Sequence, residues 1–247
     1  MATIGEMSIG DIVSLKVDGA AKDFIVVHQG LPSSDYDSSC NGTWLLMKDI
    51  YINRAHGSCI YPDSTLYAYL QNTFFPLLDE KIQSAVKEVK LPYTPALNTD
   101  AVNGANGVSA KIFDLSCAEV NITRSDANVE GAVLDYFNGA GNSKRIAYYN
   151  GTAGSWYTRT CKRAEGYICT VYSTGAQHAI GAATGAGVRP AFILPSDMSL
   201  STTPIIGNVS IGEAWKELSA AHANIGGVWK EILSAYTNVN GIWKPMS

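Results

Sequence analysis

The sequence predicts an α+β protein that consists of a sheet-rich domain, residues 1–198, and a small all-β module of hairpin repeats, residues 199–247. Three observations predict this class: alternating apolar residues near the start, one stretch with helical periodicity, and a tryptophan repeat at the end. Charged residues make up only 16% of the chain and glycine is abundant. This composition favours strands and loops over helices.

The opening segment predicts strands. "IGDIVSLKVDGAAKDFIVVHQG", residues 9–30, alternates around a turn at "VDGAA", which is the pattern of a β-hairpin. "GTWLLMKDIYI", residues 42–52, follows as a further apolar strand.

Residues 63–89 change to a helical period and predict two helices separated by a break at Pro76. Asp63 or Ser64 is the expected N-cap of the first helix, and acidic residues at 79–80 suit the first turn of the second. The expected apolar faces comprise Leu66, Tyr69 and Leu70 in the first helix and Leu78, Ile82, Val86 and Val89 in the second.

The middle of the chain is rich in Pro, Asn and Gly, and residues 91–110 predict a loop. In "KIFDLSCAEV", which follows it, we expect Phe113, Leu115 and Val120 to face the core. Residues 148–194 predict short strands linked by long surface loops, and residues 195–204 predict a linker to the tail.

The tail places Trp215, Trp229 and Trp243 fourteen residues apart. A single helix is disfavoured because Gly226-Gly227 and Asn240-Gly241 would lie inside it, whereas both pairs suit two-residue hairpin turns. The repeat therefore predicts a β-meander of three hairpin units. The indoles could form its core, pack against a neighbouring subunit or the preceding domain, or stack on sugar rings; we expect them at an assembly contact.

Charge and hydropathy exclude several classes of partner. The net charge is −4 without a long run of Lys or Arg, so nucleic acid is not an expected partner. No stretch approaches 18 consecutive apolar residues, and the N-terminus lacks the features of a signal peptide. We therefore expect no membrane insertion, and synthesis in a cytoplasm without an export signal.

No catalytic motif is present, and we expect no enzyme activity and no cofactor. The histidines and acids are scattered, without the spacing of a metal or acid–base site. "RSDANVEG", residues 124–131, could supply a few calcium ligands but not a dedicated cage, so no metal site is predicted. We expect the five cysteines to be small buried hydrophobes, with pairing of Cys161 and Cys169 left open.

A candidate ligand-binding face lies between residues 148 and 183, where Tyr, Ser, Asn and Gly gather. These are the residue types of antibody paratopes, which combine rigid aromatic contact area with adaptable hydrogen bonds. The alternative is that loop-rich β-domains contain such residues anyway. The predicted ligand-binding residues are Tyr148, Tyr149, Asn150, Thr152, Ser155, Tyr157, Thr158, Tyr167, Tyr172, Ser173, Gln177 and His178.

Three large side chains in the same region are expected to be structural. Arg159 and Arg189 lie beside apolar strands, and a guanidinium can bond several carbonyls that irregular loops leave unpaired. Trp156 is expected in the core rather than at a ligand.

Five stretches carry a resemblance to a known family: "IGDIV", "STLYAYLQNTFF", "KIFDLSCAEV", "RIAYYNGTAGSWYTRT" and "GVRPAFILPSD". In this order, over residues 8–198, they resemble a family of uncharacterised domains in phage and gut-bacterial proteins. That family is similar to a branch of the C-type-lectin-like fold, which also includes the formylglycine-generating enzymes. The tail repeat "NVNGIWK" resembles hairpin repeats at the ends of phage structural proteins.

The resemblance implies a function. The same fold serves the variable proteins of diversity-generating retroelements, which display a ligand-binding face on phage tails or bacterial surfaces. It implies a phage-tail adhesin, made in the bacterial cytoplasm and located in the virion. The implied partners are a host cell-surface protein or glycan, other tail subunits, and further copies in a homo-oligomer. A purely structural tail or baseplate protein is the alternative.

Overall fold

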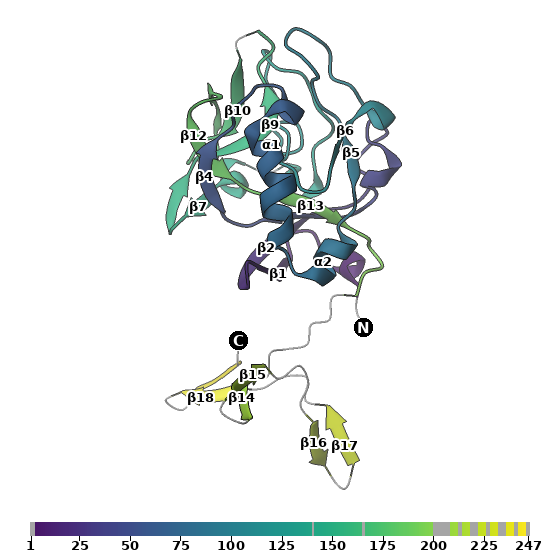
Figure 1. Cartoon of the computed structure of the whole chain (residues 1–247), viewed down its shortest axis with the longest axis vertical. Helices are drawn as coiled ribbons and strands as arrows, with labels where there is room; N and C mark the ends of the chain where they lie inside the picture. The colour runs from purple at the N-terminus through teal and green to yellow at the C-terminus, as the bar shows by residue number, and fades with distance from the viewer. Residues whose placement is uncertain are drawn as a thin grey trace. The chain divides into compact units, whose positions relative to one another are not determined.

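The computed structural model describes residues 3–139, 141–164 and 166–199 in full, and the backbone of six strands between residues 208 and 245. The chain divides into two compact units, Ala2–Ser199 and Leu200–Ser247. The larger unit is a mixed α/β structure in which sheets predominate (Figure 1). In the described part of the chain, no helix has the length and apolar character of a membrane span.

The first sheet is antiparallel with the strand order β1-β2-β3-β13. Its strands are β1 (Ile12–Val17), β2 (Ala20–Gly30), β3 (Gly42–Met47) and β13 (Ala191–Leu194). Asp18 and Gly19, which connect β1 to β2, have φ values of 52° and 72°, as a two-residue type I′ turn requires. The predicted hairpin is confirmed, whereas the single strand predicted over residues 42–52 ends at Met47, and Ile52 begins β4 (Ile52–Ala55) in the second sheet.

The second sheet has the order β11-β10-β9-β12-β4, in which only β12 and β9 are parallel. Its strands are β4 (Ile52–Ala55), β9 (Trp156–Cys161), β10 (Tyr167–Val171), β11 (Gln177–Gly181) and β12 (Gly185–Val188). A separate pair precedes β9, formed by β7 (Ala147–Tyr149) and β8 (Thr152–Gly154).

The long loops predicted between these strands are wrong, because short turns connect them. The turn between β7 and β8 consists of Asn150 and Gly151, with φ values of 50° and 80°. Asn and Gly adopt this left-handed conformation at low cost, so their abundance here closes tight hairpins. The long irregular stretch lies earlier, between residues 111 and 146.

The helical segment begins with α1 (Thr65–Tyr69), continues through a π-helical turn (Leu70–Phe74) and ends in a 3₁₀ turn (Phe75–Leu77). The hydroxyl of Ser64 caps it by accepting from the backbone N–H of Tyr67 at 2.9 Å. Pro76 changes the helix type, and the break follows at Leu78. The second helix, α2 (Glu80–Ala85), is shorter than predicted because Val89 is the first residue of β5.

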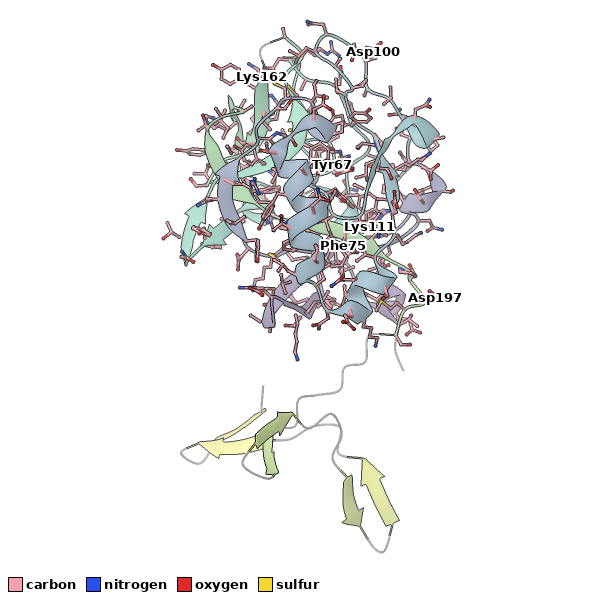
Figure 2. The ribbon with its side chains drawn as sticks, in the orientation of Figure 1. Tyr67, Phe75, Asp100, Lys111, Lys162 and Asp197 are labelled. Atoms are coloured by element: carbon pink, nitrogen blue, oxygen red, sulfur yellow. The ribbon has the colours of Figure 1, made fainter. Side chains whose placement is uncertain are left out.

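Helix α1 lies between β4 and the antiparallel pair β5 (Val89–Leu91) and β6 (Val108–Ala110) (Figure 1). The hydroxyl of Tyr67 donates to the carbonyl of Ser109 at 2.5 Å. Further along the segment, the Lys111 ammonium lies 4.7 Å from the centre of the Phe75 ring (Figure 2). These contacts attach the helix to the start of the irregular stretch.

Trp44 of β3 lies at the centre of the hydrophobic core. Its ring meets the rings of Tyr36 and Phe113 edge to face, each at 5.6 Å. Phe113, Leu115 and Val120 are completely buried, which confirms that this segment faces the core.

An ion pair is buried beneath the irregular stretch. The guanidinium of Arg159, in β9, donates to both carboxylate oxygens of Glu119 at 2.6 and 2.7 Å, and both side chains are fully buried. It also donates to the carbonyls of Pro92 and Asp114, each at 3.0 Å. One side chain therefore holds Pro92, just after β5, and two positions of the irregular stretch against the second sheet.

The tail strands pair as three antiparallel hairpins in one repeated register. They are β14 (Asn208–Ile211) with β15 (Ala214–Glu217), β16 (His222–Ile225) with β17 (Val228–Glu231), and β18 (Tyr236–Val239) with β19 (Ile242–Pro245). In each, the tryptophan is the second residue of the second strand. The expected turn residues at 226–227 and 240–241, and the tryptophan side chains, lie outside the described residues.

The predicted continuous meander is wrong for the described strands, because each hairpin forms its own two-stranded sheet. Two residues separate the paired ends within a hairpin, so local sequence sets that register. Nothing equally local sets a register between hairpins.

Replacement of Arg159 tests the buried ion pair. Arg159→Met leaves the Glu119 carboxylate buried without its partner, so we expect the free energy of unfolding to fall by about 3–5 kcal/mol. Urea unfolding measures it. The matched control, Arg124→Met, removes an ion pair with Asp126, whose side chain is 42% exposed, and should cost about 1 kcal/mol or less. Equal losses in the two variants would contradict the assignment.

Candidate functional site

Two hairpins present most of the predicted ligand-binding residues. The β7–β8 hairpin carries Tyr148, Tyr149, Asn150 and Thr152, and the β10–β11 hairpin carries Tyr167, Tyr172, Ser173, Gln177 and His178. Tyr149, Ser155 and Ser173 are half-buried. The exposed members are Tyr148, Asn150, Thr152, Tyr167, Tyr172, Gln177 and His178.

Tyr157 and Thr158 are wrongly assigned to the binding face, because neither is accessible to solvent. Both belong to β9, a central strand whose residues are all buried. The Tyr157 hydroxyl donates to the Thr184 carbonyl, and the Thr158 hydroxyl donates to the Cys169 carbonyl at 2.7 Å. The polar and aromatic residues of this strand therefore serve the core.

The exposed residues form two groups at opposite ends of β10. Tyr172 and His178 pack ring against ring at 5.2 Å, beside the turn between β10 and β11. That turn packs on the 3₁₀ helix η8 (Asn142–Arg145), where the Arg145 guanidinium donates to the carbonyl of Gly175 at 2.8 Å. Since η8 leads directly into β7 and Tyr148, one end of the domain carries these rings; we call Tyr148, Tyr172 and His178 the aromatic end.

Tyr167 lies away from the aromatic end. It precedes Tyr172 by five residues, about 17 Å along an extended strand. The Lys162 ammonium lies 5.5 Å from the centre of its ring, and Figure 2 shows Lys162 at the end of the domain far from Asp197. A single ligand that contacts both groups would have to span the length of the strand.

Two buried arginines support the aromatic end. Arg189 donates to the carbonyls of Met47 and Lys48 at 3.1 and 2.8 Å, and its guanidinium lies 4.5 Å from the ring of Trp156. Arg145, which the sequence analysis missed, also donates to the carbonyls of Val120 and Asn121. Arg145 begins the motif "RIAYYNGTAGSWYTRT", but its role could not be predicted because its acceptors come from distant parts of the chain.

The five cysteines are free, and four of them are buried. Cys161 pairs in register with Ile168, so Cys169, the next residue, faces the opposite side of the sheet and the two cannot bridge. Burial and the neighbouring thiol of Cys59 raise the pKa of Cys161. A hydrogen bond with Cys117, together with burial, raises the pKa of Cys169. Neither thiol is thus activated as a nucleophile.

A second polar cluster lies in the core around His56 and Asp114. The His56 ring packs against Tyr157 at 5.1 Å, and the backbone N–H of Asp114 donates to the Tyr61 hydroxyl at 2.9 Å. Burial lowers the pKa of His56 to about 4 and raises the pKa of Asp114 to about 8. Both are therefore neutral at pH 7. Both are also fully buried, so they are poorly placed to meet a substrate.

The oxygens of residues 124–131 are engaged with the protein itself. Asp126 binds the Arg124 guanidinium at 2.8 and 2.9 Å. The Glu130 carboxylate accepts from the hydroxyls of Thr94 and Thr160 at 2.6 and 2.7 Å. Among the described residues, no three His, Cys, Asp or Glu side chains gather closely enough to hold a metal ion.

Residues 41–196 match the family described as Domain of unknown function (DUF6273). The chain belongs to the DUF6273 family. The match begins at β3 and ends just after β13, so it includes both hairpins of the aromatic end but not the β1–β2 hairpin. No curated protein and no solved structure matches the chain.

Asp114 gives the DUF6273 domain a testable pH dependence. Its folded pKa of about 8 exceeds its ordinary value of 3.8, so the native state keeps a proton that the unfolded state loses, and stability falls as pH rises. Between pH 4 and 6.5, His56 is protonated in the unfolded state but neutral in the native state, so its contribution makes stability rise with pH. This contribution opposes that of Asp114 below pH 6.5. We therefore expect a fall between pH 6.5 and 8, at most about 1.4 kcal/mol per pH unit.

Urea unfolding at pH 6.5, 7.2 and 8.0 checks this dependence. Asp114→Asn should flatten the profile, because it removes the titrating proton while keeping the shape. His56→Gln is the control and should leave the slope above pH 6.5 in place. A wild-type profile that rises over this interval would overturn the assignment.

Proposed function

We propose that the chain is a non-catalytic, receptor-binding protein of a phage tail, and that its aromatic end contacts a molecule on the host surface. The observation that carries this proposal is the exposure of tyrosines on rigidly supported hairpins: Tyr148 is 48% and Tyr172 46% exposed. Large aromatic side chains held at the surface are typical of sites that bind proteins or sugars.

The surroundings of these rings favour binding over catalysis. The neighbouring Gln177 and Ser173 can form adaptable hydrogen bonds, as in a paratope. Arg145 fixes the β10–β11 turn to η8, so the rings lose little freedom when a ligand binds. His56 and Asp114, two ionisable groups with strongly shifted pKa values, lie in the core rather than beside the exposed rings.

We also propose that the larger unit is a branch of the C-type-lectin-like fold. The motifs "RIAYYNGTAGSWYTRT" and "GVRPAFILPSD" support this, since the first forms the β7–β8 pair and the central strand β9, and the second forms β13 with the end of β12. The phage tail as location follows from the same resemblance and from the tail repeats. In this proposal, the sheets form the scaffold and the hairpins form the display surface.

Substitution at the aromatic end tests the function. Tyr148→Ala combined with Tyr172→Ala should weaken binding of the purified chain to an array of gut-bacterial surface glycans and proteins at least tenfold, because central aromatic anchors each contribute about 1 kcal/mol or more. The thermal midpoint should stay within about 2 °C, since both rings are half exposed.

Two further variants make the result interpretable. Tyr167→Ala removes an equally exposed ring from the other end of β10 and should leave the binding unchanged. Tyr157→Ala should lower the thermal midpoint, because that side chain is buried. If the double variant binds every surface component as the wild type does, the aromatic end is not the receptor site.

A purely structural tail or baseplate protein remains the second candidate, and the tail hairpins favour it. Ser210, Asn224 and Asn238 lie opposite the three tryptophans in the same register position. Two-stranded hairpins are marginal in water by themselves. A repeated aromatic position on three of them is therefore suited to contacts with other copies or tail subunits.

Self-association tests this role of the tail. We expect the full chain to form oligomers in sedimentation velocity, and the triple variant Trp215→Ser, Trp229→Ser and Trp243→Ser to sediment as a monomer. Truncation after Ser199 should have the same effect and leave the larger unit folded, because the bonds of Ile4 and Gly5 to residues 196–198 are retained. Unchanged assembly with loss of sugar binding alone would instead identify a carbohydrate-binding ladder.

A further inference from the structure

A cavity of about 350 Å³ opens beside the aromatic end. It lies between the β1–β2 hairpin, the turn after β3, and the segment from Tyr136 to Tyr148. Its lining combines charged groups (Lys48, Asp49, Lys144 and Arg189) with the rings of Tyr136 and Tyr148 and with isoleucines. Three cations face one carboxylate, so the cavity is electropositive within a chain whose net charge is −4.

Arg189 is the unusual member of this lining. It is 99% buried, since only 1% of its surface is exposed. Two of its nitrogens donate to the carbonyls of Met47 and Lys48, and the Trp156 ring covers its guanidinium. The third nitrogen, Nη1, is buried and has no hydrogen-bond partner among the described residues. Arg189 forms no ion pair with a carboxylate among the described residues, so its positive charge adds to that of the cavity that it lines.

The other charged groups are arranged to leave room for an anion. Lys144 donates to the carbonyl of Tyr136 at 3.1 Å and lies over that ring at 4.7 Å, so no carboxylate neutralises it in these contacts. Lys48 has only a long, half-exposed pairing with Asp23, at 3.8 Å. Both ammonium groups can therefore turn toward a ligand at little cost.

The remaining lining indicates what the anion is attached to. Asp49 accepts from the backbone N–H of Tyr148 at 3.2 Å through one oxygen, and its exposed carboxylate can accept further bonds from hydroxyls. The exposed Tyr148 ring offers a face on which a sugar ring can stack. Inorganic phosphate would use neither feature, and a second negative charge would be repelled by Asp49.

We propose that this cavity binds an acidic sugar, with the sugar's carboxylate accepting from the two lysines beside the positive charge of Arg189. Asp49 then accepts from the sugar hydroxyls, and the ring stacks on Tyr148. The guanidinium is already fixed by two carbonyls and an indole, so its charge keeps its place beside the cavity. This inference rests on the proposed function, because it names the ligand class for a site that shares Tyr148.

The test is calorimetric titration of the full chain with sodium glucuronate, and with glucose as the neutral counterpart. Glucuronate should bind at least tenfold more tightly than glucose. The double variant Lys48→Gln with Lys144→Gln should weaken glucuronate binding at least fivefold. The control Lys90→Gln with Lys111→Gln removes the same charge outside the cavity and should have no effect. Arg189→Lys should also weaken binding, with folding checked by its thermal midpoint.

Three results would overturn the inference: equal binding of glucuronate and glucose, equal loss in the two lysine double variants, or inorganic phosphate binding as tightly as glucuronate. Failure here is distinguishable from failure of the proposed function. If Tyr172→Ala abolishes binding to surface molecules while the cavity lysines do not matter, the receptor role holds and the acidic-sugar site does not. If glucuronate binding depends on the lysines while Tyr172→Ala leaves binding to surface molecules unchanged, the acidic-sugar site is supported and the proposed receptor surface is contradicted.

Discussion

The buried ion pair between Arg159 and Glu119 is the constraint on which the larger unit depends. Moving both charges out of water costs several kcal/mol for each ion, and the mutual attraction offsets this only when the remaining donors are also satisfied. Here they are, because the guanidinium reaches the carbonyls of Pro92 and Asp114, and Glu119 also accepts from the Tyr36 hydroxyl at 2.8 Å. A misplaced irregular segment would leave a buried charge unpaired, so the pair specifies one path for the chain.

Two further buried arginines bond backbone carbonyls of irregular segments in the same way. Arg145 and Arg189 are buried, and each donates to two or more backbone carbonyls. Strands satisfy their carbonyls within a sheet, whereas irregular segments need another donor, and a planar guanidinium with five N–H groups provides it. The consequence is a stiff support for the β7–β8 and β10–β11 hairpins, which is the condition for precise display of exposed rings.

Local signals predicted the local parts of this structure well. The turn at Asp18-Gly19 predicted the first hairpin, and the core positions of Phe113, Leu115 and Val120 were predicted correctly. Of the two N-caps expected, Asp63 and Ser64, the structure has Ser64. The errors arose where distant partners decide. Tyr157 resembles a paratope residue in its neighbourhood, but it lies in a strand covered on both faces. Val89 continues a helical period, yet pairing with Ala110 draws it into a strand.

The cavity beside Tyr148 shows the limit of reading residues one segment at a time. Its charged residues are Lys48, Asp49, Lys144 and Arg189, which come from three separate parts of the sequence. None of them lies in a motif that indicates a ligand. Arg189 was expected to bond carbonyls because it lies beside an apolar strand, but the sequence cannot show which carbonyls it bonds. Such contacts are a property of the whole packed structure. For that reason, only the structure shows that these charged residues line one cavity.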